Sequence, residues 1–287
     1  MDTMKNISIK LIKDIGKIII PLVIYYLTYF LTYIVLTTLV TKIVHLDKYI
    51  PEHEITIRGI LGGISMLIGT LPLIADFRQE VRKRGEYRQN VPCRQIKTDI
   101  RKEQRVHLGD VKVALYKSVP ITITLAIASS VVINFIFIRL HILETSETYS
   151  RVAEHQYGVS FIIGIILYGL VSPFAEEVVF RGIIYNKIRK DYPVVTAVIL
   201  SAFLFGLYHG NIVQGAYGFL MGILIAYTYE QFGSFIHAFL FHSAANITVY
   251  MITSNEAVYN VVMTPYICVA LAVIAAVMLW LMNKEKR

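Results

Sequence analysis

Two adjacent glutamates and an arginine interrupt an otherwise apolar segment, Ser172-Pro-Phe-Ala-Glu-Glu-Val-Val-Phe-Arg181. On a helix, Glu177 and Arg181 stand four residues apart, share one face and can form an ion pair. Glu176 points about 100° away from that pair and has no local partner. A charge at the centre of a membrane helix costs roughly 2.5–3.5 kcal/mol. We therefore expect Glu176 to have a chemical role, such as accepting a proton from water.

The proline of this segment predicts polar surroundings. Pro173 has no N–H and should leave the carbonyl of Gly169, four residues earlier, without its helical donor. Within a membrane, such a carbonyl is tolerated only where polar groups or water satisfy it.

A histidine lies at the same predicted depth as Glu176. The turn between two apolar segments lies at Asp191-Tyr192-Pro193, with Glu176 16 residues before Tyr192 and His209 17 residues after it. At 1.5 Å per residue, both side chains stand about 24–26 Å from the turn. An antiparallel pair of helices would therefore bring Glu176 and His209 to one level.

A third segment supplies hydrogen-bond donors. His242 and Asn246 are four residues apart, near the middle of an uncharged run. A carboxylate and an imidazole can hold and deprotonate water, and a second imidazole with an amide can stabilise an oxyanion. Together these residues suit peptide hydrolysis inside a membrane. The sequence lacks the His-Glu-x-x-His zinc motif, paired aspartates within a span and a Gly-x-Ser-Gly segment.

The composition is that of a membrane protein. Hydrophobic residues make up 55% and charged residues 17%, against about 45–50% and about 25% in soluble chains. This excludes a disordered or ordinary soluble protein, and two cysteines exclude a disulfide scaffold. One uncharged run, 192–229, is long enough for two helices broken near Gly210. The other uncharged runs that can cross a bilayer are 18–41, 59–75, 118–138, 155–175, 231–255 and 257–283. We therefore predict an all-α polytopic protein with about eight transmembrane helices.

The distribution of basic residues predicts the orientation. With both termini in the cytoplasm, 23 of the 28 Lys and Arg residues lie on the inner side, 12 of them in the predicted basic loop 76–117. The net charge of +8 therefore reflects topology and requires no nucleic-acid partner. Three regions follow: an N-terminal membrane region over 1–157 with three spans, a core over 158–250, and a last span with its tail over 251–287. In the core, Gly218 and Gly222 form a G-x-x-x-G face that favours close packing against neighbouring helices over dimerisation.

The polar segments resemble the CPBP family of membrane proteases, which includes type II CAAX prenyl endopeptidases and bacteriocin-processing or bacteriocin-immunity proteins. The family motifs Glu-Glu-x-x-x-Arg, Phe-x-x-x-His and His-x-x-x-Asn occur here in order as 176–181, 205–209 and 242–246. The resemblance implies that Glu176 is the general base and that His209 orients the water. It also implies that His242 and Asn246 form the oxyanion hole and that Glu177 and Arg181 support the site.

The residues leave the cofactor open. Imidazole and carboxylate both suit zinc, and a zinc site would use Glu176, His209 and His242. However, Glu176 and Glu177 diverge on a helix, and the predicted partner of His242 is Asn246, a poor zinc ligand. We therefore favour water activation without a metal or other cofactor.

The resulting expectation is an intramembrane endopeptidase that cleaves a membrane-associated peptide or membrane-anchored protein, in a bacterial plasma membrane. CAAX-type processing, peptide-pheromone or bacteriocin maturation, and immunity all fit the family resemblance. A proton-coupled transporter and a non-catalytic immunity protein are the alternatives. Against the transporter, residues 1–150 contain no counterpart of the Glu-Glu-x-x-x-Arg segment. The sequence specifies neither the cleaved bond nor the oligomeric state.

Overall fold

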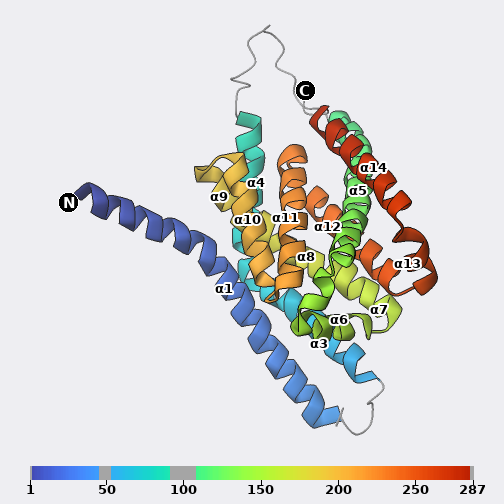
Figure 1. The fold of residues 1–287 in the computed structure, drawn as a ribbon. Helices are drawn as coiled ribbons and strands as arrows, with labels where there is room; N and C mark the ends of the chain where they lie inside the picture. The colour runs from blue at the N-terminus through green and yellow to red at the C-terminus, as the bar shows by residue number, and fades with distance from the viewer. Residues whose placement is uncertain (1, 45–52, 91–107, 285–287) are drawn as a thin grey trace.

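The computed structural model describes residues 2–44, 53–90 and 108–284, and within these ranges the chain is helical without β-strands (Figure 1). Seven helices of this part are long and apolar enough to cross a membrane. The eighth predicted span is the shorter apolar helix Val194–Tyr208, whose 15 residues extend only about 22 Å. The prediction of an all-α polytopic membrane protein is confirmed, with one helix too short to span alone.

The chain begins with two long helical elements, of which the first packs beside the opening helix of the second (Figure 1). The first is α1 (Asp2–Val44). The second is α3 (Glu54–Thr70), which continues through η2 (Leu71–Leu73) into α4 (Ile74–Asn90).

The predicted loop 76–117 is wrong at both of its ends. Residues 76–90 belong to α4, residues 108–117 open α5 (Leu108–Arg139), and 91–107 lie outside the described residues. Helix persists past the apolar stretch because Arg, Glu, Gln and Lys have high helix propensity. The i,i+4 ion pair of Arg82 and Glu86, with 3.7 Å between nitrogen and oxygen, further stabilises this helix.

Two further segments each consist of two helical elements. The stretch before the core contains η3 (Ile142–Thr145) and a short helix, α6 (Glu147–Tyr157), capped by the Ser146 side chain, which accepts from the Tyr149 amide. The predicted last span 257–283 consists of α13 (Glu256–Val262) and α14 (Pro265–Lys284). Pro265 accounts for the break, because proline is favoured at a helix start and disfavoured within a helix.

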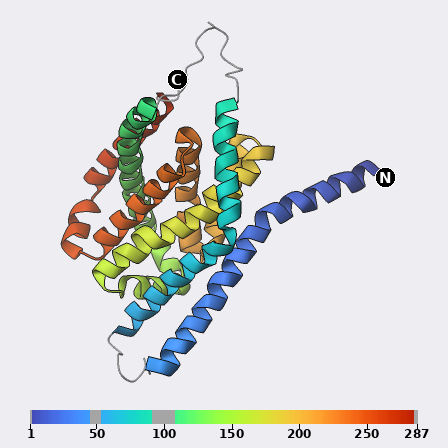
Figure 2. The same cartoon turned by 180° about the vertical axis from the view of Figure 1, so that it is seen from behind.

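The segment that carries the two glutamates is an α-helix interrupted by two stretches of π-helix. It comprises α7 (Phe161–Ile166), the π-helix η4 (Leu167–Val171), α8 (Ser172–Glu177), the π-helix η5 (Val178–Tyr185) and α9 (Asn186–Asp191). Seen from behind, it crosses the bundle beside α3 and α4 (Figure 2). Wider turns free backbone carbonyls, and polar side chains satisfy them. Ser201 Oγ donates to Phe180 O at 3.2 Å and Asn186 Nδ2 to Gly182 O at 2.9 Å. Single π-turns within α-helices occur frequently at functional sites.

Glycines allow the following two helices to pack closely. Between α10 (Val194–Tyr208) and α11 (Ile212–Phe232), a Cβ built on Gly206 would lie 2.6 Å from the carbonyl oxygen of Gly215. Gly210, with φ +70°, forms the turn at the predicted break. A Cβ built on Gly222 would lie 3.1 Å from Ala202 of α10. The G-x-x-x-G face therefore packs on α10.

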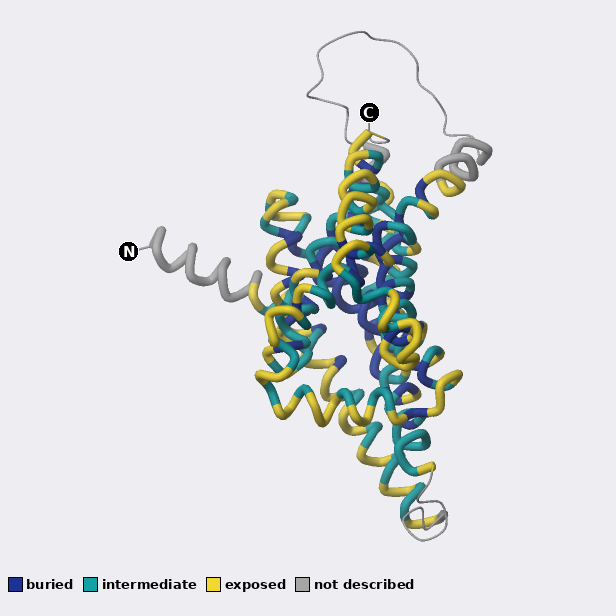
Figure 3. The backbone as a smooth tube through the Cα atoms, turned by 45° about the vertical axis from the view of Figure 1, so that its right-hand side comes forward, coloured by how far each residue is buried: buried dark blue, intermediate teal, exposed yellow. Residues whose placement is uncertain are grey.

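The core is formed where the Phe161–Asp191 segment meets α10, α11 and α12 (Phe235–Thr253), and all residues of η5 are buried. In Figure 3 buried residues gather at the centre of the bundle and exposed residues on its periphery. Exposed side chains include Ile20, Leu31, Leu207 and Trp280. Such an apolar outer surface suits contact with lipid.

Candidate functional site

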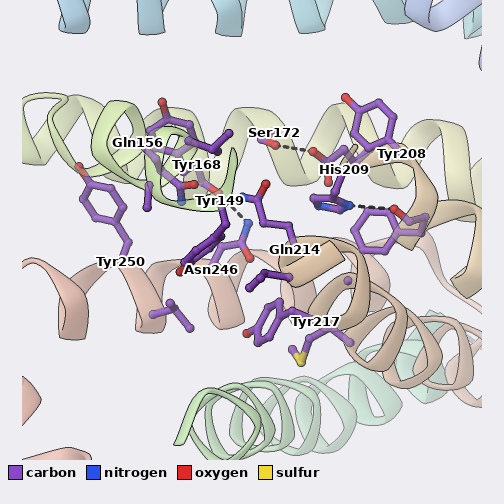
Figure 4. Close-up of a pocket in the computed structure, with 18 of the residues that line it drawn as sticks. Tyr149, Gln156, Tyr168, Ser172, Tyr208, His209, Gln214, Tyr217, Asn246 and Tyr250 are labelled. Carbon is purple, nitrogen blue, oxygen red and sulfur yellow. Dashed lines mark hydrogen bonds between the residues drawn. The ribbon is translucent and has the colours of Figure 1, made fainter. Parts of the chain in front are cut away.

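One cavity of about 440 Å³ is lined by all four residues predicted to be catalytic (Figure 4). Glu176 comes from α8, His209 from the end of α10, and His242 and Asn246 from α12. The depth argument anticipated that Glu176 and His209 would meet, and both line this cavity.

Glu176 is held by a serine one turn earlier on its own helix. Ser172 Oγ donates to Glu176 Oε1 at 2.6 Å, and both residues line the cavity (Figure 4). Glu176 Oε2 lies 3.8 Å from His242 Nε2, and the glutamate side chain is only 7% exposed. Sequence reasoning missed Ser172, although its i,i+4 spacing from Glu176 places it on the same helix face.

His209 is held in one tautomer. Its Nδ1 lies 2.8 Å from the carbonyl oxygen of Phe205, and a carbonyl only accepts, so Nδ1 carries the hydrogen. Neutral His209 then has its lone pair on Nε2, where it can accept a hydrogen bond from water. Gly218 makes room for the ring, because a Cβ at Gly218 would lie 3.1 Å from His209 Cε1.

Glu177 and Arg181 form the predicted ion pair. Arg181 Nη1 donates to Glu177 Oε1 at 2.9 Å, and both side chains are 0% exposed. Arg181 Nη2 donates to the carbonyl oxygen of Gly222 at 3.1 Å. The guanidinium carbon lies 4.6 Å from the centre of the Phe205 ring, a cation–π contact.

The pair also orients His242, which the sequence analysis did not foresee. His242 Nδ1 lies 2.8 Å from Glu177 Oε1. A carboxylate only accepts, so His242 donates from Nδ1, and its Nε2 is the ring nitrogen nearer Glu176. Glu177 therefore links Arg181 to the site. No spacing rule signals this contact, because the two residues are 65 positions apart.

Asn246 satisfies a freed backbone carbonyl, but not the predicted one. Its Nδ2 donates to the carbonyl oxygen of Tyr168 at 3.0 Å (Figure 4). In η4 the Ser172 amide bonds to Leu167 O, five residues back. In this register the amide that would reach Tyr168 O is that of Pro173, which has no hydrogen. The prediction of Gly169 assumed an uninterrupted α-helix, whereas the π-turn makes Tyr168 O the carbonyl opposite Pro173.

The side chains that a zinc site would use do not form a metal-binding cluster in the described residues. A zinc site would have needed Glu176, His209 and His242 to converge. In the described part of the chain, no three His, Cys, Asp or Glu side chains form a group that could hold an ion. His242 donates from Nδ1 to Glu177, and His209 donates from Nδ1 to Phe205 O. Nε2 is therefore the nitrogen of each ring through which a histidine could bind an ion.

Tyrosines and side-chain amides form much of the remaining cavity wall. Several of these side chains come from α6, whose sequence contains no recognisable motif. Burial raises the pKa of Tyr157, at the end of α6, to about 12, so its phenol is neutral at pH 7. The tyrosines that line the cavity are Tyr26, Tyr29, Tyr149, Tyr157, Tyr168, Tyr208, Tyr217 and Tyr250. This wall offers hydroxyl groups to a bound ligand.

Comparison with known families gives one match, over the part of the chain that carries these residues. Residues 158–248, about a third of the chain, match the family model described as type II CAAX prenyl endopeptidase Rce1-like. Comparisons with curated proteins and with solved structures gave no match. The matched region contains the three motifs and every residue of the predicted site. The chain is a multi-pass membrane protein whose residues 158–248 resemble the Rce1-like, type II CAAX prenyl endopeptidase family.

Proposed function

We propose that this protein hydrolyses a peptide bond of a membrane-associated peptide or membrane-anchored protein, with water activated by Glu176 and His209. The observation that supports this most is the shared cavity: a carboxylate, two imidazoles and an amide from three helices line one space. Those are the groups that water activation and oxyanion stabilisation require.

Glu176 acts as the base. Its Oε1 accepts from Ser172, which leaves Oε2 to take a proton from water. Nε2 of His209 accepts the second hydrogen of the same water and so orients it. The water oxygen attacks the peptide carbonyl carbon, and Glu176 then returns the proton to the leaving amine.

His242 and Asn246 stabilise the oxyanion. Glu177 accepts from His242 Nδ1 and so orients the ring; Nε2, when it carries a hydrogen, is the donor to the oxyanion. The amide nitrogen of Asn246 has two hydrogens: one bonds Tyr168 O, and the other is available to the oxyanion. Both donors are held in place before substrate binds, as this type of catalysis requires.

Cleavage of membrane-anchored peptide libraries by the purified protein in lipid vesicles, with products read by mass spectrometry, tests the proposal. Glu176→Gln should reduce turnover by a factor of about 10²–10⁴, the range for a general base. The control is Glu54→Gln, a half-exposed glutamate paired with Arg58 away from the cavity, which should cleave like the wild type. A transporter or a non-catalytic immunity protein would yield no product. Full activity of Glu176→Gln would refute the proposed mechanism.

A further inference from the structure

The wall of the catalytic cavity includes four side-chain amides, those of Asn134, Gln156, Gln214 and Asn246. Two of them already donate to backbone carbonyls. Asn246 Nδ2 donates to Tyr168 O at 3.0 Å, and Asn134 Nδ2 donates to Ser130 O at 2.9 Å. Within the described part of the chain, Gln214 is the one amide of the four whose oxygen is fixed by a hydrogen bond while its nitrogen has no partner.

The cap of α11 determines which end of the Gln214 amide is fixed. The backbone N–H of Gln214 donates to Asn211 Oδ1 at 2.9 Å, so Nδ2 of the same Asn211 side chain is a donor. This Nδ2 lies 2.6 Å from Gln214 Oε1, which therefore accepts. Gln214 Nε2 is then the unbonded end of the amide, with two hydrogens to donate. Figure 4 shows Gln214 among the residues that line the cavity.

Gln214 stands one helical turn from the place where His209 contacts α11. A Cβ built on Gly218 would lie 3.1 Å from His209 Cε1, so the imidazole rests against the helix at that residue. Gln214 and Gly218 share a helix face and are separated by about 6 Å along the axis. One residue of an extended peptide spans about 3.3–3.6 Å. The amide therefore lies one or two substrate residues away from the water that His209 orients.

A peptide bound in this cavity has backbone carbonyls on either side of the cleaved bond, and these lose their hydrogen bonds to water. A buried carbonyl without a donor is unfavourable. Because Asn211 holds Gln214 Oε1, the nitrogen is oriented before the peptide arrives, and less side-chain entropy is lost on binding.

We propose that Gln214 is a substrate-binding residue, whose Nε2 donates to a backbone carbonyl oxygen one or two residues from the cleaved bond. This inference rests on the proposed function, because it places the cleaved bond at the water between Glu176 and His209. It adds to that function a residue that fixes the register of the peptide in the cavity.

Two substitutions separate substrate binding from helix capping. Gln214→Glu retains an oxygen that accepts from Asn211, and glutamate suits this third helical position as well as glutamine does, but it has no amide hydrogens. Gln214→Met removes the donor and the acceptor together. Both are made in Glu176→Gln protein, which binds peptide with little turnover. The control is Gln79→Met, at an exposed glutamine of α4.

Peptide affinity is the measurement. A fluorescent peptide is selected from the membrane-anchored library by its binding to Glu176→Gln protein, and its affinity is measured by fluorescence anisotropy in detergent. We expect Gln214→Glu and Gln214→Met each to weaken binding about tenfold, as the loss of one hydrogen bond to a buried group does. Gln79→Met should bind within twofold of the Glu176→Gln protein.

Modified peptides identify the carbonyl. One peptide bond at a time is replaced by an alkene, which has no carbonyl oxygen. One replacement should weaken binding about tenfold when Gln214 is present and less than twofold in Gln214→Met, because the two changes remove the same hydrogen bond. Cleavage of the unmodified peptide by the wild type, read by mass spectrometry, should place that carbonyl one or two residues from the cleaved bond.

The outcomes distinguish the inference from the proposed function. Unchanged affinity in Gln214→Glu would show that Gln214 only caps α11 and would overturn the inference. Additive effects at every replaced bond, or a coupled carbonyl farther from the cleaved bond, would overturn it as well. A coupled carbonyl in a peptide that the wild type does not cleave would leave Gln214 as a binding residue and refute the proposed function instead.

Discussion

Substituting Glu177 by Gln should reveal how much of the fold depends on one buried charge. Glutamine has nearly the same shape, and its amide oxygen can still accept from Arg181 and His242, so the change removes charge with little loss of volume. Arg181 is then a cation at 0% exposure without a counter-ion. Breaking a buried pair in this way costs about 3–5 kcal/mol. At roughly 2–4 °C per kcal/mol, the melting temperature should fall on the order of 10 °C.

The chain offers a matched control for this substitution. Glu54 and Arg58 form another i,i+4 glutamate–arginine pair, with 2.7 Å between their charged atoms, but their side chains are 36% and 39% exposed. Water solvates either partner there, so Glu54→Gln should cost less than about 1 kcal/mol. Thermal melts of both variants in one detergent give the comparison. A Glu177→Gln melt within 2 °C of the wild type would refute the role of the buried pair.

A double variant separates stability from catalysis. Adding Arg181→Met to Glu177→Gln removes the stranded charge, and most of the lost stability should return, because apolar side chains often replace buried ion pairs without loss. Activity should not return. Glu177→Gln turns a charged hydrogen bond to His242 into a neutral one, a loss of about 1 kcal/mol, or about fivefold in rate. Recovery of activity together with stability would show that Glu177 does not act through His242.

Four other outcomes are expected. Ser172→Ala should lower turnover about tenfold by removing a hydrogen bond to the charged Glu176, whereas Ser172→Thr should retain most of it; equal rates in both would exclude a positioning role for the hydroxyl. Gly218→Ala should slow cleavage severalfold by pressing on His209, whereas Gly85→Ala, with nothing within 4 Å of its added Cβ, should be neutral in the same assay. Activity should survive exhaustive chelation, and loss with EDTA that stoichiometric zinc restores would establish a metalloprotease. Reporter fusions at residues 95 and 287 should both report cytoplasm, and either one on the outer side would overturn the orientation derived from the Lys and Arg bias.

The sequence predicted the helical membrane architecture because the bilayer imposes length and composition on each segment separately. An uncharged run such as 118–138 has few alternatives to a helix, since every backbone group must be satisfied within the segment. The Glu177–Arg181 pair was predictable for a similar reason, as i,i+4 geometry is local. The level of His209 followed from helix rise and a turn that proline marks.

Contacts between distant segments, and shifts of helical register, were decided by the tertiary structure. The bond from His242 to Glu177 depends on how α12 lies against α8, and no local periodicity encodes that. The bond from Asn246 to Tyr168 O depends on the π-turn η4, whose wider register leaves that carbonyl without a backbone donor and is apparent only in the packed helix. The contribution of α6 to the cavity likewise arises from packing, since its own sequence has no chemical signature. The composition of the cavity wall is therefore a property of the packed bundle: each segment supplied its residues, and the packing determined which of them line the cavity with Glu176.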